Sequence, residues 1–213
     1  MAATVEPPRS IWRFVWTPVG LLVAALAAMW AIEIVDTIAL DDRLQRNGLQ
    51  PRRREGLDGV LWAPFLHADF GHIASNSVPF LALGGLVAVR GMRYWGWVTG
   101  TAIVVGGGLT WLLGGSGNHI GASGVVFAYF GAILGAAVFE RRVRALAAAL
   151  LALGFYSSLI AGLVPQDAIS WEGHLFGLIA GVLAAKAMAE PRVAPEDRPD
   201  NPEPWEIDEP WLQ

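Results

Sequence analysis

The sequence contains no cysteine and little charge. Only 16% of its 213 residues are Asp, Glu, Lys or Arg, and none is Cys. Without cysteine, the chain can form neither a disulfide framework nor a thiolate metal site. Soluble domains carry about a quarter charged residues, so the low charge argues against an ordinary soluble fold. The net charge of -4, with no concentrated basic domain, argues against a nucleic-acid partner.

Apolar residues are abundant instead. They make up 54% of the chain, and the mean hydropathy is +0.44. This composition predicts an all-α polytopic membrane protein. The apolar stretch from Phe14 to Ile32 is long enough to span a membrane, and no small-residue cleavage site clearly follows it. We therefore expect a retained first transmembrane helix and not a cleaved signal peptide.

Uncharged runs locate the membrane spans, because a helix needs about 20 apolar residues to cross the hydrocarbon. The third run is about twice as long as one span needs, and it contains a cluster of turn formers at 114–118 that divides it into two helices. Lys186 can snorkel, so the last helix continues to about Ala189. Six transmembrane helices are therefore expected. The runs are residues 14–32, 71–89, 94–139, 145–166 and 173–185.

Arginines in short loops predict the orientation, because cytoplasmic loops are enriched in them. Those after the second and fourth spans lie on the cytoplasmic side if both termini are cytoplasmic. The first loop, about 41–60, is an exception, since its five arginines are then placed outside. The arginines that set the orientation are Arg90 and Arg93, then Arg141, Arg142 and Arg144, together with Arg9 and Arg13 of the N-terminal flank.

Three regions follow from this topology. Residues 1–13 are expected to be a cytoplasmic N-terminal segment, and residues 14–190 a six-helix membrane domain. Residues 191–213 are rich in Pro, Asp and Glu and lack apolar periodicity. They are expected to form a disordered cytoplasmic tail.

Polar residues gather at one end of the predicted bundle. The second, fourth and sixth spans all begin at the outer face, which places His72 and Asn76, Ser123, and His174 at a similar depth. Polar groups at membrane depth are costly and usually mark a water-filled cavity or a functional site. Each has a structural alternative when taken alone. A membrane serine often bonds back to its own helix, and a histidine at a helix end is often interfacial.

Together these residues suit nucleophilic catalysis. The Ser123 hydroxyl needs a base to take its proton, and His174 is the candidate. Gly121 and Gly124 leave room for a carbonyl carbon, although such glycines also permit tight helix packing. The start of the helix adds free N–H donors and the positive end of its dipole, which stabilise an oxyanion.

His72 and Asn76 are four residues apart and share one helix face, so both can donate to the same oxyanion. A structural pair that buttresses the loop is the alternative. His67 is expected to pack. The carboxylates Glu33, Asp36, Asp167 and Glu172 have no spacing that compels pairing with His174. We therefore predict a Ser–His dyad.

Neither a metal nor another cofactor is expected. His67 and His72 are five residues apart, which differs from the histidine pair and intervening glutamate of the zincin helix. No convincing carboxylate completes a site.

Three separated motifs resemble those of the rhomboid family of intramembrane serine proteases. Gly121-Ala122-Ser123-Gly124 resembles the family's GxSG nucleophile motif. His67-x4-His72-x3-Asn76 is similar to its HxxxxHxxxN pattern on the second helix. Gly173-His174-x2-Gly177-x3-Gly181 resembles the sixth-helix motif, whose glycines pack against the nucleophile helix. The resemblance covers about residues 15–190.

The resemblance implies a Ser123–His174 dyad that cleaves transmembrane proteins near the outer face of a bacterial plasma membrane. It also implies an oxyanion hole formed by His72, Asn76 and the Ser123 backbone N–H. The partners are then the lipid bilayer and single-span substrates whose upper turns unwind. Lateral access past the fifth span implies a gate and cap formed by Phe155, Tyr156, Ile169 and Trp171.

Two positions depart from the family pattern. Phe127 stands where well-known bacterial members have a tyrosine that stacks on the base, so the ring is kept and the hydroxyl is lost. The first-loop Trp-Arg pair of many members is not evident, and Trp62 and the arginines of 52–54 are poor substitutes.

Two other classes of protein are the alternatives. A catalytically silent rhomboid-like protein could bind transmembrane clients for quality control, but silent relatives usually lose Ser123 or His174. A small transporter would place polar residues near the bilayer midplane, where these spans are apolar.

Overall fold

A computed structural model describes residues 11–166 and 169–189, with side chains from Thr17 onward. Within these ranges the regular elements are helices, and the one extended pairing is a single bridge between Leu49 and His119. The all-helical prediction is therefore confirmed for this part of the chain. The predicted tail 191–213 lies outside it.

The helices follow one another with short connections, apart from a long first loop. The long elements are α1 (Ile11–Ala39), α3 (Phe70–Ala88), α4 (Met92–Thr101), α5 (Gly107–Leu113), α6 (Ser123–Glu140), α7 (Val143–Tyr156) and α8 (Trp171–Met188). The short ones are η1 (Leu44–Asn47), η2 (Arg54–Gly56), α2 (Gly59–Trp62), η3 (Ala63–Phe65), the π-helical η4 (Ala102–Gly106) and the 3-10 helix η5 (Ser157–Leu163).

Five segments are long and apolar enough to cross a membrane, which identifies an integral membrane protein. They are Thr17–Ala39, Phe70–Ala88, Met92–Leu113, Ser123–Glu140 and Val143–Leu163. The sixth expected span, 173–185, coincides with α8. This helix falls outside the set, since it carries Glu172 and His174 in its first turn and Lys186 in its last. Five of the six predicted spans are thus supported by length and composition.

The first helix is longer than the predicted span 14–32. It begins at Ile11 and runs to Ala39, so Glu33 and Asp36 lie inside it, each only 3% exposed. The Asp36 carboxylate accepts hydrogen bonds from the backbone N–H groups of Leu44 (2.8 Å) and Gln45 (3.1 Å). The buried charge therefore fastens the first loop to α1 and does not end the helix.

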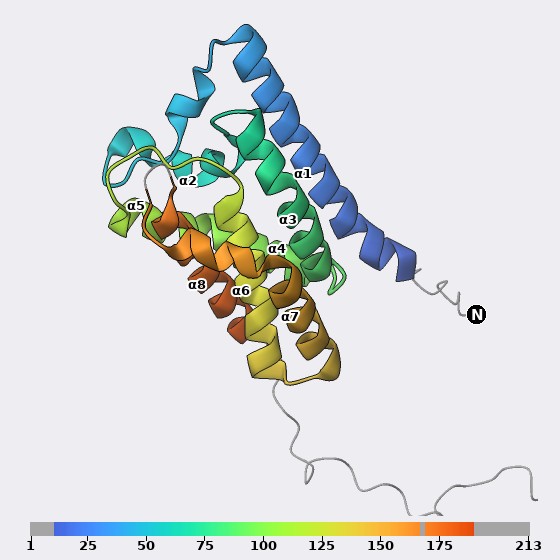
Figure 1. Ribbon diagram of the computed structural model, residues 1–213. Helices are drawn as coiled ribbons and strands as arrows, with labels where there is room; N and C mark the ends of the chain where they lie inside the picture. The colour runs from blue at the N-terminus through green and yellow to red at the C-terminus, as the bar shows by residue number, and fades with distance from the viewer. Residues whose placement is uncertain (1–10, 167–168, 190–213) are drawn as a thin grey trace, which may run out of the picture.

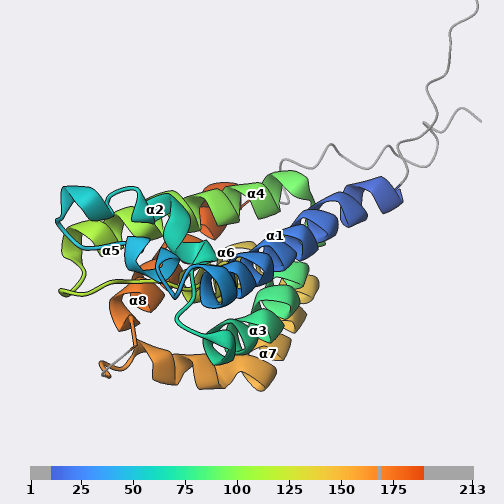
Figure 2. The same ribbon diagram turned by 90° about the horizontal axis from the view of Figure 1, so that it is seen from above.

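The central helix is α6. Seen from above, α4 and α5 lie on one side of it and α7 on the other (Figure 2). Most of its residues are buried. Its closest partner is α8. A Cβ at Gly177 would stand 2.2 Å from the Gly124 carbonyl oxygen, and one at Gly181 only 1.9 Å from that of Ala128. Glycine is required here because the two backbones touch.

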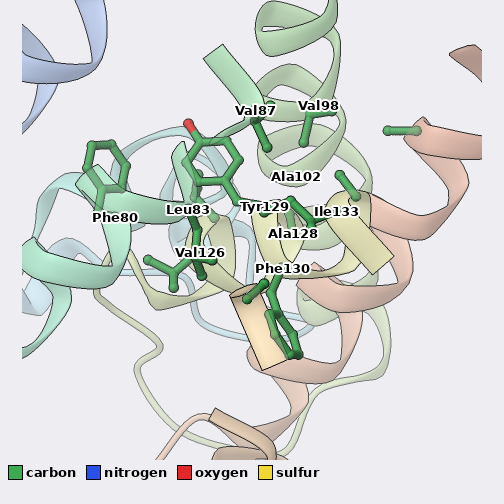
Figure 3. Packing of buried hydrophobic residues seen from close by; sticks show 14 of the residues in the cluster. Phe80, Leu83, Val87, Val98, Ala102, Val126, Ala128, Tyr129, Phe130 and Ile133 are labelled. Atoms are coloured by element: carbon green, nitrogen blue, oxygen red, sulfur yellow. The ribbon is translucent and has the colours of Figure 1, made fainter. Parts of the chain in front are cut away.

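The main hydrophobic core joins α3, α4 and α6. Figure 3 shows Phe80, Leu83 and Val87 of α3 beside Val126 and Tyr129 of α6. Tyr129 is fully buried, and its hydroxyl forms a 3.0 Å hydrogen bond with the Thr99 hydroxyl of α4. A polar group this deep is therefore satisfied within the bundle.

The last turns of α3 and α6 meet at one end of the bundle. The Arg90 guanidinium, just beyond α3, forms an ion pair with Glu140 at the end of α6. It also lies 4.0 Å above the centre of the Tyr94 ring. The first turns of α3 and α6 must therefore lie together at the opposite end.

The first loop packs at that opposite end, with the starts of α3, α6 and α8 (Figure 1). Leu49 and His119 exchange two backbone hydrogen bonds of 3.0 and 2.8 Å. The Arg52 backbone N–H donates to the Trp111 carbonyl (2.9 Å), and its guanidinium donates to that of Gly114 (2.7 Å). These bonds fix the loop that leads into α6.

Candidate active site

Ser123 is the first residue of α6. The chain turns into this helix at Gly121, whose φ of +110° only glycine adopts without strain. The Gly121 N–H donates to the Ala63 carbonyl (2.9 Å), which ties the turn to η3. The first N–H groups of an α-helix have no acceptor within the helix, so this turn also presents free donors.

His174 lies in the first turn of α8 and reaches across to Ser123. Its Nε2 is 2.8 Å from the Ser123 hydroxyl, and its Nδ1 is 2.8 Å from the Gly162 carbonyl oxygen. A carbonyl oxygen can only accept, so Nδ1 carries the proton. In the neutral ring, Nε2 is then unprotonated and faces the serine, as a general base requires.

Two neighbours hold the His174 ring in this position. Phe127, one turn after Ser123, stacks on it with the ring centres 4.3 Å apart and the planes 8° from parallel. Gly162 lies at the edge of both rings, where a Cβ would stand 3.1 Å from His174 Nδ1 and 3.0 Å from Phe127 Cζ. The ring is therefore confined by an aromatic face and by backbone.

His72 and Asn76 bring side-chain donors toward Gly121. A Cβ at Gly121 would stand 2.7 Å from His72 Nε2 and 3.6 Å from Asn76 Nδ2. His72 Nδ1 accepts the Ala68 N–H at 3.4 Å, which leaves the proton of the neutral ring on Nε2. Asn76 donates one amide hydrogen to the His72 carbonyl (3.1 Å), which leaves its second amide hydrogen for another acceptor.

These groups surround one open cavity of about 940 Å³. The four polar side chains singled out from the sequence, those of His72, Asn76, Ser123 and His174, all line it, as does Phe127. A second cavity of about 60 Å³ touches Ser123 and His174 from the side of η4 and α5. The site thus combines a nucleophile, a base, directed donors and open space.

His67 lies behind the cavity and is 2% exposed. Its Nε2 accepts the Ala122 N–H at 3.4 Å, and its ring meets that of His72 edge-on at 5.1 Å. Burial, and secondarily the nearby His72, lowers the pKa of His67 to about 4. A neutral His67 therefore supports the residue that precedes Ser123.

Of the four expected gate and cap residues, two line the large cavity and two do not. Trp171 and Ile169 line the large cavity. Phe155 and Tyr156, in the last turn of α7, do not line it. Phe155 is 77% exposed, and Tyr156 packs partly buried against the core.

Sequence reasoning did not anticipate the partner of His174 Nδ1. In the described residues no carboxylate bonds to His174, and the Gly162 carbonyl takes that place. Glu172 instead accepts the Gly115 N–H (3.1 Å), while Asp167 lies outside the described residues. A backbone carbonyl leaves no mark on the sequence. Among the described residues, no group of three or more His, Asp or Glu side chains could hold a metal ion.

Fold and site together define a helical integral membrane protein with a serine–histidine pair at the starts of two packed helices. The family profile described as the Rhomboid domain matches residues 55–191. The chain belongs to the rhomboid family, which confirms the resemblance found in its motifs.

Several mycobacterial proteins are similar to this chain. Those named Uncharacterized protein Rv1337 of Mycobacterium tuberculosis and Uncharacterized protein Mb1372 of Mycobacterium bovis are each 35% identical over 176 residues. The match covers 78% of this chain and 73% of theirs. Uncharacterized protein ML1171 of Mycobacterium leprae is 32% identical over 190 residues, covering 84% of this chain and 75% of its own length.

Proposed function

We propose that this protein is an intramembrane serine endopeptidase that cleaves single-span transmembrane proteins near the outer membrane face. One observation carries the proposal. His174 Nε2 lies 2.8 Å from the Ser123 hydroxyl while Nδ1 is held by the Gly162 carbonyl, so the pair has the tautomer and distance of a nucleophile and its base.

The proposed reaction proceeds through an acyl-enzyme. The Ser123 oxygen attacks the carbonyl carbon of the scissile bond while its proton passes to His174 Nε2. The tetrahedral intermediate collapses as His174 gives that proton to the leaving amine, which frees the first product. A water molecule, activated by the same histidine, then hydrolyses the ester and restores Ser123.

The oxyanion of the intermediate is stabilised by donors that converge at Gly121. We assign this role to His72 Nε2–H, the unused amide hydrogen of Asn76, and the Ser123 backbone N–H. The positive end of the α6 dipole adds to them. Gly121 is needed because any side chain would occupy the space beside His72.

In this proposal no carboxylate completes a triad with Ser123 and His174. The Gly162 carbonyl fixes the orientation of the His174 ring and accepts the Nδ1–H hydrogen bond throughout the cycle. Phe127 keeps the ring parallel to its own by stacking, so the missing tyrosine hydroxyl is not required for the position of His174.

In this proposal α8 is a sixth transmembrane helix, despite its charged ends. Gly177 and Gly181 hold it in backbone contact with α6, which is itself long and apolar enough to span. Glu172 and Lys186 lie in the first and last turns, where side chains reach the interface.

The site then faces outward, with both termini cytoplasmic in a bacterial plasma membrane. Arg90 and Arg93 follow α3, and Arg141 and Arg144 follow α6, at the end remote from Ser123. The opposing arginines belong to the first loop, where Arg52 is engaged with the Gly114 carbonyl. The substrate enters beside α7, past Phe155 and Tyr156, with Trp171 and Ile169 covering the cavity.

The test is cleavage of a fluorescent single-span substrate in liposomes. We expect turnover by the wild type and none above background by Ser123→Ala or His174→Ala. Asn76→Ala should reduce turnover by about tenfold to a thousandfold, as loss of an oxyanion donor does. Equal cleavage by wild type and Ser123→Ala contradicts the proposal. Retained substrate binding without cleavage by the wild type favours a silent client-binding protein instead.

A further inference from the structure

His119, four residues before Ser123, connects the loop before α6 to the start of α8 and lies outside the three sequence motifs. Its Nδ1 is hydrogen-bonded to the Ser170 hydroxyl, and its Nε2 lies 3.2 Å from the Gly115 carbonyl oxygen. The loop passes beside the first turn of α8 in both views of the ribbon (Figure 1, Figure 2).

The two hydrogen bonds of His119 fix its tautomer. The Gly115 carbonyl can only accept, so Nε2 carries the proton in the neutral ring. Nδ1 is then the acceptor, and the Ser170 hydroxyl donates to it. The bond therefore has a defined direction, from the start of α8 to the loop before α6.

Ser170 precedes α8 as its N-cap residue, yet its side chain makes no capping bond to that helix. Serine is favoured at N-caps because its hydroxyl satisfies an N–H of the first turn. Here the hydroxyl is committed to His119, while the Ser170 carbonyl accepts the His174 N–H at 3.1 Å. Ser170 thus links His119 to the turn that carries the base.

Further hydrogen bonds hold His119 and its surroundings in place. Its backbone N–H and carbonyl both bond to Leu49. Gly115, which accepts from His119, also donates its N–H to Glu172 in the first turn of α8. His119 and Ser170 line both cavities that meet at Ser123 and His174.

Backbone contact with α6 begins only after His174. A Cβ at Gly177 would overlap the Gly124 carbonyl oxygen at 2.2 Å, and one at Gly181 would overlap that of Ala128 at 1.9 Å. At Gly173, which precedes His174, the nearest neighbours of a Cβ would be atoms of Ser170 and Thr110 and not of α6. Side-chain bonds therefore add to the restraint in the first turn of α8.

We propose that His119 and Ser170 form a positioning pair that holds the first turn of α8, and with it His174, at reacting distance from Ser123. The inference rests on the proposed protease function. Neither residue touches the reacting atoms in this scheme. They act through the placement of His174, and a misplacement of about 1 Å can lower a rate by about a hundredfold.

The direct test measures the rate at which a fluorophosphonate probe labels Ser123, together with kcat and KM for the fluorescent substrate. Ser170→Ala and His119→Phe should each lower the labelling rate and kcat by about ten- to a hundredfold, with KM nearly unchanged. The double variant should be no slower than His119→Phe alone, because that substitution already removes the bond between the two side chains.

Conservative and matched variants separate positioning from general destabilisation. His119→Asn keeps an acceptor two bonds from Cβ, as Nδ1 is, so it should recover most of the activity lost in His119→Phe. Ser157→Ala, an exposed serine of η5 outside both cavities, should behave as wild type. Unchanged labelling and kcat in folded Ser170→Ala and His119→Phe overturn the proposal while leaving the dyad intact.

A second readout does not depend on activity. The chain has only four histidines, so ring ¹⁵N spectra of labelled protein can be assigned by substitution. Ser170→Ala should shift the ring nitrogens of His119 and also those of His174. If the wild type neither cleaves substrate nor reacts with the probe, the protease proposal fails. The spectra then decide the positioning pair alone, and an unchanged His174 signal overturns it.

Discussion

At the scale of single residues, the site depends on backbone as much as on side chains. Ser123 and His174 could be named from the sequence because each lies in a recognisable motif. The structure places the Ser123 hydroxyl oxygen 2.8 Å from His174 Nε2. Gly162 could not, since its contribution is a carbonyl oxygen that any residue possesses. His119 and Ser170 were missed for a related reason. A histidine and a serine 51 residues apart carry no shared pattern until the chain folds.

Gly162 gives a residue-scale prediction. In Gly162→Ala the added methyl group would stand 3.1 Å from His174 Nδ1 and 3.0 Å from Phe127 Cζ, so the stacked rings must shift. We expect kcat for substrate cleavage to fall by about tenfold or more, because the base leaves its reacting position. Gly154→Ala, on α7 with open space around it, is the matched control and should retain wild-type kcat. Equal kcat in the two variants would contradict the assigned role of Gly162.

At the scale of elements, the family resemblance and the all-helical fold could be predicted from the sequence. The end of α1 could not, and α8 is not apolar enough to be identified as a span by hydropathy. Charge alone suggested that the first helix stops at Ile32, but the Asp36 carboxylate is satisfied by backbone N–H groups of the loop. The last helix has charged ends that lower its apolar character. It is held instead by glycines against α6, an arrangement that hydropathy does not measure.

The α6–α8 contact gives an element-scale prediction. A methyl group at Gly181 would overlap the Ala128 carbonyl, so Gly181→Ala must push the helices apart. We expect a loss of about 1–3 kcal/mol of stability, seen as a lower thermal midpoint in detergent. The control is Gly85→Ala on α3, where nothing lies within 4 Å of the new Cβ. If both variants melt as the wild type does, the close backbone contact is not present in the folded protein.

At the scale of the whole molecule, the bundle has two unlike ends. One end carries the cavity, the first loop and the starts of α3, α6 and α8, and the other carries the Arg90–Glu140 ion pair and the arginines after α6. The parallel course of α3 and α6 made this separation predictable from the order of the spans. Which end faces outward stays a prediction from the arginine distribution.

Orientation can be tested by cysteine labelling, because the chain has no cysteine of its own. Ser116→Cys lies in the exposed loop at the cavity end, and Val143→Cys lies at the start of α7, where Val143 is 84% exposed. A membrane-impermeant maleimide should label Ser116→Cys in intact cells and Val143→Cys only after permeabilisation. The reverse pattern would place the site on the cytoplasmic side.

The central claim is that Ser123 is a nucleophile activated by His174, and the covalent adduct tests it most directly. Purified protein is treated with the fluorophosphonate probe, and the modified residue is located by mass spectrometry. We predict one adduct, on Ser123, formed by the wild type and abolished in folded His174→Ala. An adduct on another serine, no adduct, or equal labelling of Ser123 in His174→Ala would contradict it.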